Sequence, residues 1–80
     1  MKDLMRAKLH ELMRARLLVE RSELLEKNVK LFDFLQSEDV KGIDEEHVRL
    51  LWEQFDHMNK YSIVLGKRID LLTSEMGEDK

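Results

Sequence analysis

The chain has 80 residues, enough for one domain, but at this size folding hides only about 60% of the surface that the unfolded chain exposes. Hydrophobic residues make up 42% and charged residues 39%, with no proline and no cysteine, which excludes a disulfide framework, thiolate metal sites and a cysteine nucleophile. Aromatic residues reach only 6%, whereas Leu, Glu, Lys, Arg and Met abound, which favours helices over strands. The composition predicts an all-α protein that associates with further copies.

The charge is distributed unevenly along the chain. Residues 1–16 hold five cations and two carboxylates, giving +3, which leaves −6 for residues 17–80. A basic helix on an acidic body can attract an anionic ligand or the acidic face of another copy, and both interpretations stay open. No apolar stretch approaches the ~20 residues of a membrane span, and charges interrupt the apolar positions at the start, unlike a signal peptide. We therefore expect a cytoplasmic protein without membrane contact.

The first predicted element is one long helix over residues 3–36. Asp3 is a plausible N-cap, and neither proline nor glycine interrupts the pattern before Gly42. The apolar residues form a broad stripe on one face that needs a large partner surface. They fall in pairs one heptad apart: Leu17 and Leu18, Leu24 and Leu25, Leu31 and Phe32, then Leu35.

A loop at residues 37–44 and a second helix at 44–73 follow. Gly42 is able to take a positive φ, and Asp44 is placed to cap the second helix. Apolar residues then recur at alternating spacings of three and four, with Ser62 the one polar member. The positions are Val48, Leu51, Phe55, Met58, Ser62, Leu65, Ile69 and Leu72. The sequence thus predicts an antiparallel two-helix hairpin over residues 1–73, with a flexible tail at 74–80.

Two further rows run along the second helix. Leu50, Val64 and Leu71, with His57 in the same row, lie roughly opposite the seam, which favours a homo-oligomer over scattered surface residues. His47, Gln54, Tyr61 and Arg68 form a row beside the seam. The guanidinium and the phenol of that row suit an anionic, ring-bearing ligand. Alternatively, Tyr61 packs on the hairpin edge and Arg68 pairs with a carboxylate.

Motifs for catalysis are incomplete. His10 and Glu11 begin like a zincin motif, but Arg14 occupies the place of the second histidine. His57 lies one turn after Glu53, a spacing better explained by a solvated pair than by a metal site. The glycines stand alone, so no phosphate loop is present. The basic segment lacks aromatic residues for stacking on bases. We expect neither an enzyme nor a DNA- or RNA-binding protein, and no cofactor or metal.

The sequence resembles a family of small phage-encoded helical hairpins. The pattern RV-x-x-E-x-x-x-L-x-x-K-x-x-x-L-x-x-F of their first helix is matched from Arg16 to Phe34. The pattern LL-x-x-Q-x-x-x-M-x-x-Y-x-x-x-L-x-x-RI of their second helix is matched from Leu50 to Ile69. The matching positions are Arg16, Leu17, Glu20, Leu24, Lys27, Leu31 and Phe34, then Leu50, Leu51, Gln54, Met58, Tyr61, Leu65, Arg68 and Ile69.

This family includes the phage anti-CBASS sponges, and its hairpin is shared with anti-Thoeris sponges. The resemblance implies a homo-oligomer, typically a hexamer, that sequesters cyclic di- and trinucleotide messengers in the host cytoplasm without cleaving them. Lys27 corresponds to the lysine that grips the ligand phosphates, and Arg68 to the arginine of the trinucleotide pocket. Arg16, Gln54 and Tyr61 match the pattern and are further candidates for ligand binding.

One departure from the family pattern affects the dinucleotide site. The family has an aromatic residue near the start of the first helix that stacks on a base, whereas this chain has Leu12 and Met13 there, and the nearest ring is His10. Stacking of a base on an aromatic ring contributes ~1–3 kcal/mol. The alternative to a nucleotide sponge is a non-catalytic helical assembly or adaptor that binds a host or phage protein.

Overall fold

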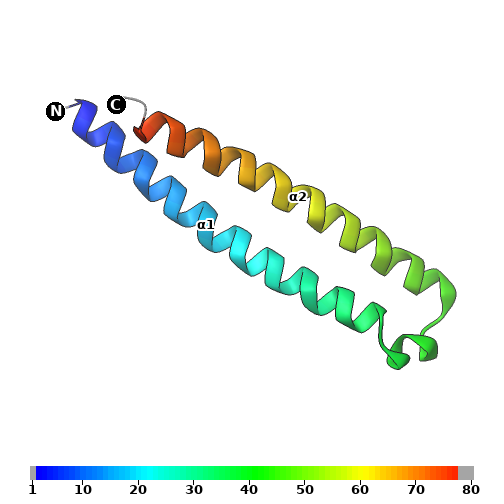
Figure 1. The fold of residues 1–80 in the computed structure, drawn as a ribbon. Helices are drawn as coiled ribbons and strands as arrows, with labels where there is room; N and C mark the ends of the chain where they lie inside the picture. The colour runs from blue at the N-terminus through cyan, green and yellow to red at the C-terminus, as the bar shows by residue number, and fades with distance from the viewer. Residues whose placement is uncertain (1, 78–80) are drawn as a thin grey trace.

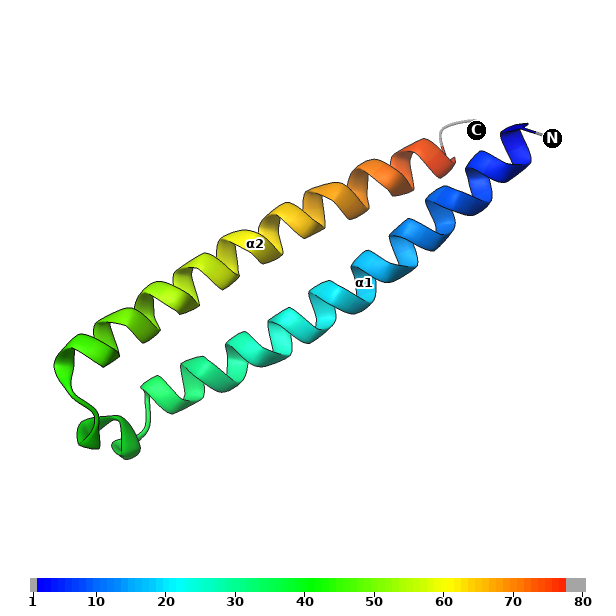
Figure 2. The same ribbon diagram turned by 180° about the vertical axis from the view of Figure 1, so that it is seen from behind.

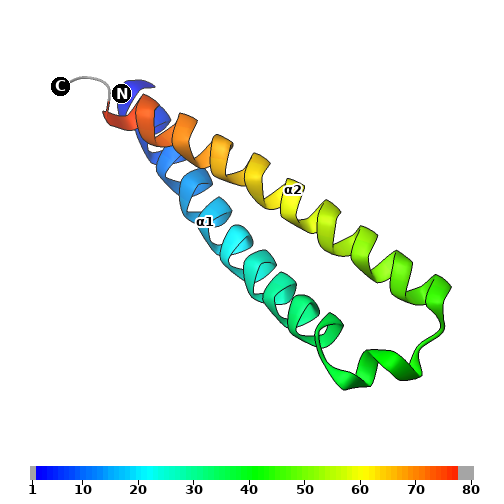
Figure 3. The ribbon, with the colours of Figure 1, turned by 45° about the vertical axis from the view of Figure 1, so that its right-hand side comes forward.

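Two long antiparallel helices account for most of the chain in the computed structural model, which describes residues 2–77, with the side chains of 3–75. Helix α1 runs over Lys2–Leu35, the 3-10 helix η1 over Glu38–Gly42, and helix α2 over Glu45–Gly77. The hairpin measures 59 × 18 × 14 Å, with both ends of the described chain at the same end of the rod (Figure 1). The same arrangement is seen from behind (Figure 2) and after a turn of 45° about the vertical axis (Figure 3). The prediction of an all-α hairpin is confirmed.

The second-helix seam faces α1 as the spacing predicted. All eight of its residues are buried or half-buried, and Leu65 is completely buried. The core proper lies in the half of the hairpin nearest the termini, where Leu65, Ile69 and Leu72 pack against Leu17. Complete burial of one such side chain is worth about 1.5–3 kcal/mol. This short core explains how two helices hold together over this half of the rod.

The inward face of α1 is more polar than its apolar stripe suggested. One member of each predicted pair points into the hairpin, while Leu18, Leu25 and Phe32 remain between 39% and 41% exposed. A row of residues seven apart fills the remaining inward positions with Arg14, Arg21 and Asn28. The inward-facing residues of α1 are His10, Arg14, Leu17, Arg21, Leu24, Asn28, Leu31 and Leu35. Half of this seam is therefore polar.

The connection between the helices is more ordered than a plain loop. The Ser37 hydroxyl donates to the Phe34 carbonyl over 2.7 Å, satisfying an acceptor at the end of α1. The Glu46 amide donates to Asp44 Oδ1 over 3.1 Å, which confirms Asp44 as the cap of α2. Gly42 does not adopt the positive φ that a glycine can take, since no residue of the described range has one. Gly42 ends the 3-10 helix, whose backbone does not require that conformation.

Four predicted boundaries need correction. Helix α1 starts at Lys2, so Asp3 lies in its first turn rather than at the N-cap, and it ends at Leu35 instead of residue 36. Helix α2 starts one residue after its cap and continues to Gly77 instead of stopping at Thr73. Nothing in Ser74, Glu75 and Met76 breaks a helix, so the turn continues to the glycine. The predicted tail at 74–80 is thus helical to Gly77, and 78–80 lie outside the described residues.

Candidate functional site

The interface between α1 and α2 has two long edges, one on each side of the hairpin, that face the solvent. We name the first the Tyr61 edge, and it is defined by Glu20 and Lys27 of α1 and by Gln54, Tyr61 and Arg68 of α2. Residues seven apart lie on the same face of a helix, so each helix contributes a straight row. Four of the five candidate binding residues belong to this edge: Lys27, Gln54, Tyr61 and Arg68.

The centre of the Tyr61 edge is a contact between the two helices. The Tyr61 hydroxyl donates to Glu20 Oε2, although the two residues are 41 positions apart in the chain. This hydrogen bond, with partial burial and the negative charge of Glu20, raises the pKa of Tyr61, while the positive charge of Arg68 lowers it. The phenol therefore stays neutral at physiological pH. The structure brings Tyr61, Glu20 and Arg68 within electrostatic reach of one another.

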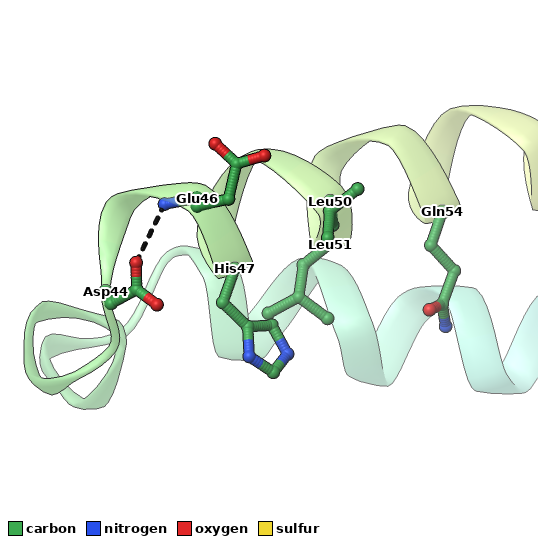
Figure 4. A pocket seen from close by; sticks show the side chains of 6 residues that line it. All are labelled: Asp44, Glu46, His47, Leu50, Leu51 and Gln54. Atoms are coloured by element: carbon green, nitrogen blue, oxygen red, sulfur yellow. Dashed lines mark hydrogen bonds between the residues drawn. The ribbon is translucent and has the colours of Figure 1, made fainter.

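Gln54 lies in a shallow groove on the α2 side of this edge. Two adjoining hollows of about 450 and 590 Å³ share Leu50 and Gln54 in their walls. Figure 4 shows the first hollow, where the side chains of His47 and Gln54 both point toward α1. The second hollow extends to Tyr61. The Gln54 amide nitrogen lies 3.7 Å from the sulfur of Met58. The amide is thus placed to exchange a weak contact for a stronger hydrogen bond to a polar ligand.

Lys27 and Arg16 occupy α1 on the same side. Lys27 is exposed and lies two turns after Glu20 on the same face. Arg16 lies one turn before Glu20, but on the outer side, where both residues line a separate hollow of about 400 Å³. The structure therefore brings Lys27 to the Tyr61 edge and places Arg16 at its outer margin.

The Tyr61 edge and its outer margin are cationic although the chain carries a net charge of −3. Helical periodicity assigns five cations and three carboxylates to this side, a net charge of +2. The cations are Arg6, Arg16, Lys27, Lys30 and Arg68, and the carboxylates are Glu20, Glu23 and Glu75. The carboxylates of Asp44, Glu46 and Glu53 line the two hollows beside Gln54, so the positive charge of this side lies at Lys27, at Arg68 and along the outer margin, where it can attract a small anion.

Lys27 and Arg68 lie far apart along this edge. Asn28 Nδ2 donates to the Phe55 carbonyl over 3.3 Å, so Lys27 is level with the neighbouring Gln54. Gln54 and Arg68 are 14 positions apart, which corresponds to about 21 Å of helix. The two cations therefore lie at different levels of the edge within one chain, about 21 Å apart along the helix.

The opposite edge contains residues whose role the sequence did not reveal. We name it the Trp52 edge, and it is defined by Arg14, Arg21, Asn28 and Phe32 of α1 and by Trp52, Gly66 and Thr73 of α2. Arg14 Nε donates to the Thr73 hydroxyl over 2.7 Å. The guanidinium of Arg21 lies against Gly66, where a β-carbon would stand 3.4 Å from its Cζ. The sequence signal for this row is the heptad spacing of Arg14, Arg21 and Asn28. It was missed because the neighbouring apolar pairs alone indicated the inward face of α1.

An aromatic cluster occupies the Trp52 edge near the loop. The ring centroids of Phe32 and Phe55 are 5.5 Å apart, and Trp52 lies 6.3 Å from Phe32 and 5.8 Å from Phe55 in edge-on geometry. A groove of about 310 Å³ beside the cluster is lined by Asn28, Asn59 and apolar side chains. Such packing contributes to stability through burial and ring geometry.

Neither a cluster of metal ligands nor a membrane-spanning helix occurs among the described residues. No group of three or more His, Asp or Glu side chains there is arranged to hold a metal ion. His57 and Glu53 both line the second hollow, without a third ligand among the described side chains. Within the same range, no helix is long and apolar enough to cross a membrane.

The described residues form an all-helical hairpin with a polar edge between its two helices. The model of the Sequestin family matches residues 11–71, which include most of both helices, the connection and all five candidate binding residues. The chain therefore belongs to the Sequestin family, whose name indicates a sequestering, sponge-type role. No curated protein and no solved structure matches the chain.

Proposed function

We propose that this protein binds cyclic di- and trinucleotide second messengers in the cytoplasm of a phage-infected bacterium and holds them intact, so that CBASS signalling is blocked. Membership of the Sequestin family supports the sequestering role. The match of Lys27, Gln54, Tyr61 and Arg68 to the sponge pattern supports the choice of ligand.

The observation that carries this proposal is the Tyr61 edge itself. It combines positive charge for phosphate with a neutral phenol and a primary amide for polar base or ribose groups. In the proposed complex, Lys27 contacts ligand phosphates and Gln54 provides hydrogen bonds in the neighbouring groove. Tyr61 and Arg68 form a second subsite, with Arg68 on phosphate, and Arg16 adds charge at the outer margin.

The distance between Lys27 and Arg68 has a consequence for the proposed ligands. The phosphates of a cyclic dinucleotide belong to one small ring and do not bridge about 21 Å of helix. The Lys27 subsite and the Arg68 subsite therefore bind ligands independently within a chain. We assign the dinucleotide to Lys27 and the trinucleotide to Arg68, as the family resemblance implies.

Binding without cleavage and assembly into an oligomer complete the proposal. Sequestration needs no general base, nucleophile or metal, so the ligand is recovered unchanged when the protein is unfolded. The proposed assembly is a homo-oligomer, expected from the resemblance to be a hexamer. Large apolar side chains exposed on a thin two-helix rod support association, because a chain of this size gains stability by covering them.

Isothermal titration against a panel of cyclic di- and trinucleotides tests the proposal. The bound ligand is then released by heat and its integrity is measured by chromatography. Tight binding with intact ligand supports a sponge, whereas degraded ligand contradicts it. Absence of binding to every member, by protein shown to be folded, would instead favour an adaptor that binds a host or phage protein.

Lys27→Ala is the sharpest variant for this titration. Loss of a charged hydrogen bond costs about 1.5–3 kcal/mol, so the dissociation constant for a cyclic dinucleotide is expected to rise roughly ten- to hundredfold. Lys30→Ala is the matched control, because it removes the same charge from an exposed position of α1 three residues on. Equal weakening by both variants would show that only the general charge of the edge matters and that Lys27 has no specific contact.

A further inference from the structure

Glu20 lies where the Tyr61 edge meets the hollow on the outer side of α1. Its carboxylate oxygen Oε2 accepts the hydrogen bond of the Tyr61 hydroxyl across the two helices. The same side chain lines the outer hollow of about 400 Å³, together with Ala15, Arg16, Val19 and Glu23. Among the described residues, Glu20 alone belongs both to the Tyr61 edge and to this hollow.

Most of the hydrogen-bonding capacity of Glu20 is free. A carboxylate accepts hydrogen bonds through two oxygens with about four lone-pair positions, and it donates none. Tyr61 occupies one of these positions, and among the described side chains no other donor and no cation pairs with Glu20. Because hydrogen bonds are directional, the bond from Tyr61 orients the carboxylate. Glu20 is thus an oriented acceptor on the wall of the hollow.

The remaining walls of the outer hollow favour a flat, uncharged group. Ala15 and Val19 supply aliphatic surface, and Val19 is 57% exposed. Glu23 adds a second carboxylate to that of Glu20. Two carboxylates repel a phosphate and accept hydrogen bonds from a base. A nucleotide therefore enters this hollow with its base and keeps its phosphates outside.

Two arginines flank the hollow on one side of the contact between Glu20 and Tyr61. Arg16 lies one turn before Glu20 on α1, and Arg68 lies two turns after Tyr61 on α2. Because the helices are antiparallel, both positions are displaced from that contact toward the termini (Figure 1). Neither guanidinium pairs with a carboxylate among the described side chains. The two arginines are therefore available to the phosphates of a ligand whose base contacts Glu20.

The four bases differ in what they offer to a carboxylate. Guanine has two adjacent donors, N1–H and N2–H₂, whose spacing matches the two oxygens of Glu20. Adenine and cytosine place an acceptor nitrogen beside their amino group, and uracil places its N3–H between two carbonyl oxygens. An acceptor that faces the carboxylate is repelled by its lone pairs, which penalises these three bases. Guanine is the base that an oriented carboxylate selects.

From these observations we infer that Glu20 is a specificity-determining residue, which makes the outer hollow and the neighbouring Arg68 subsite select messengers that contain guanine. N1–H and N2–H₂ donate to the two oxygens of Glu20, and Oε2 uses a lone pair that Tyr61 leaves free. The guanine ring lies on Val19, and the phosphates contact Arg16 and Arg68. The inference rests on the proposed function, because it names the base that the proposed trinucleotide subsite prefers.

Titration of the unmodified protein tests the two donors directly. The probes are three cyclic trinucleotides with two adenosines and a third nucleoside, which is guanosine, inosine or adenosine. Inosine keeps the N1–H of guanosine and lacks its 2-amino group. Isothermal titration should give the tightest binding for the guanosine probe, about tenfold weaker binding for the inosine probe, and the weakest binding for the adenosine probe.

The outcomes separate this inference from the proposed function. Equal dissociation constants for the guanosine and adenosine probes overturn the inference, while tight binding of both still supports a sponge. Equal dissociation constants for guanosine and inosine overturn the contact of the 2-amino group with Glu20. Absence of binding to all three probes overturns both the inference and the proposed trinucleotide subsite.

Glu20→Gln tests whether this residue reads the base. Glutamine replaces one acceptor oxygen by an amino group, so the preference for guanosine over adenosine, as a ratio of dissociation constants, should fall at least about tenfold. The ratio cancels the general effect of removing a negative charge near phosphates. Glu26→Gln is the matched control, because it removes the same charge from an exposed position of α1 turned away from both edges. Circular dichroism checks that both variants keep their helices. An unchanged ratio in Glu20→Gln, or an equal fall in Glu26→Gln, overturns the inference.

Discussion

The two edges of the hairpin are built from different chemistry. Along the Tyr61 edge, polar side chains that are more than a third exposed carry the net positive charge, and the helices meet there through the hydrogen bond between Tyr61 and Glu20. Along the Trp52 edge, aromatic rings pack in edge-on and tilted geometry, and two arginines point inward, Arg21 against Gly66 and Arg14 onto Thr73. Exposed polar rows cost little stability and are available to a ligand, whereas half-buried rings hold helices together. The comparison favours the first edge for the proposed ligand binding and the second edge for cohesion between the helices.

The largest expected difference between the edges is in stability. Phe32→Ala removes a ring that contacts both Trp52 and Phe55, and it should lower the free energy of unfolding by about 2 kcal/mol, below the value for a fully buried ring. Tyr61→Phe, which removes only an exposed hydroxyl, should change it much less. Urea unfolding at one fixed protein concentration measures both. Equal losses would mean that the Tyr61 edge also holds the helices together.

A smaller effect is expected at Gly66. A β-carbon there would meet the Arg21 guanidinium at 3.4 Å, an ordinary contact with the flexible end of a side chain. Gly66→Ala should therefore stabilise the protein by about 0.5–1 kcal/mol, because glycine in a helix interior costs backbone entropy. Gly42→Ala, in open space at the end of the 3-10 helix, is the control and should gain less. Thermal unfolding measures both. Destabilisation by Gly66→Ala would show that Arg21 is held rigidly at the Trp52 edge.

The smallest expected effect is the titration of Tyr61. Its pKa lies above the ordinary value of 10.0, chiefly because its hydroxyl donates to Glu20. Since the folded protein favours the neutral phenol, the associated stability is complete below pH ~10 and is lost as the pH rises through the folded pKa. Tyr61 is the only tyrosine, so absorbance at alkaline pH follows it directly. Glu20→Gln should lower the midpoint and Arg68→Gln should raise it. An unchanged midpoint in Glu20→Gln would mean that the contact between the helices is absent in solution.

Much of the fold was predictable because helical periodicity is local. The alternating spacing from Val48 to Leu72 identified the inward face of α2, and Asp44 was recognisable as its cap from its position before two glutamates. The end of α2 was not predictable in the same way. Ser74 to Met76 have no strong preference, and the helix continues to Gly77 because nothing stops it.

The candidate site was predictable only in part. The row of Gln54, Tyr61 and Arg68 followed from spacing on one helix, and the family resemblance added Lys27 and Arg16. That Glu20 receives the Tyr61 hydroxyl depends on how α1 is rotated against α2, which no property of either helix alone determines. Arg21 and Asn28 were missed for the same reason, since a polar residue in the seam is stable only beside a glycine or a carbonyl supplied by the other helix.

The sequence by itself determined that this protein consists of two long amphipathic helices joined by a short connection, because the pattern of apolar residues and the lack of proline act within each helix. Only the tertiary structure decided which of two adjacent leucines on α1 faces inward and which stays at the surface. Packing determines which leucine faces inward, because Leu17 is the side chain that fits against Leu65, Ile69 and Leu72. The rotation fixed by this packing separates the cationic Tyr61 edge from the aromatic Trp52 edge.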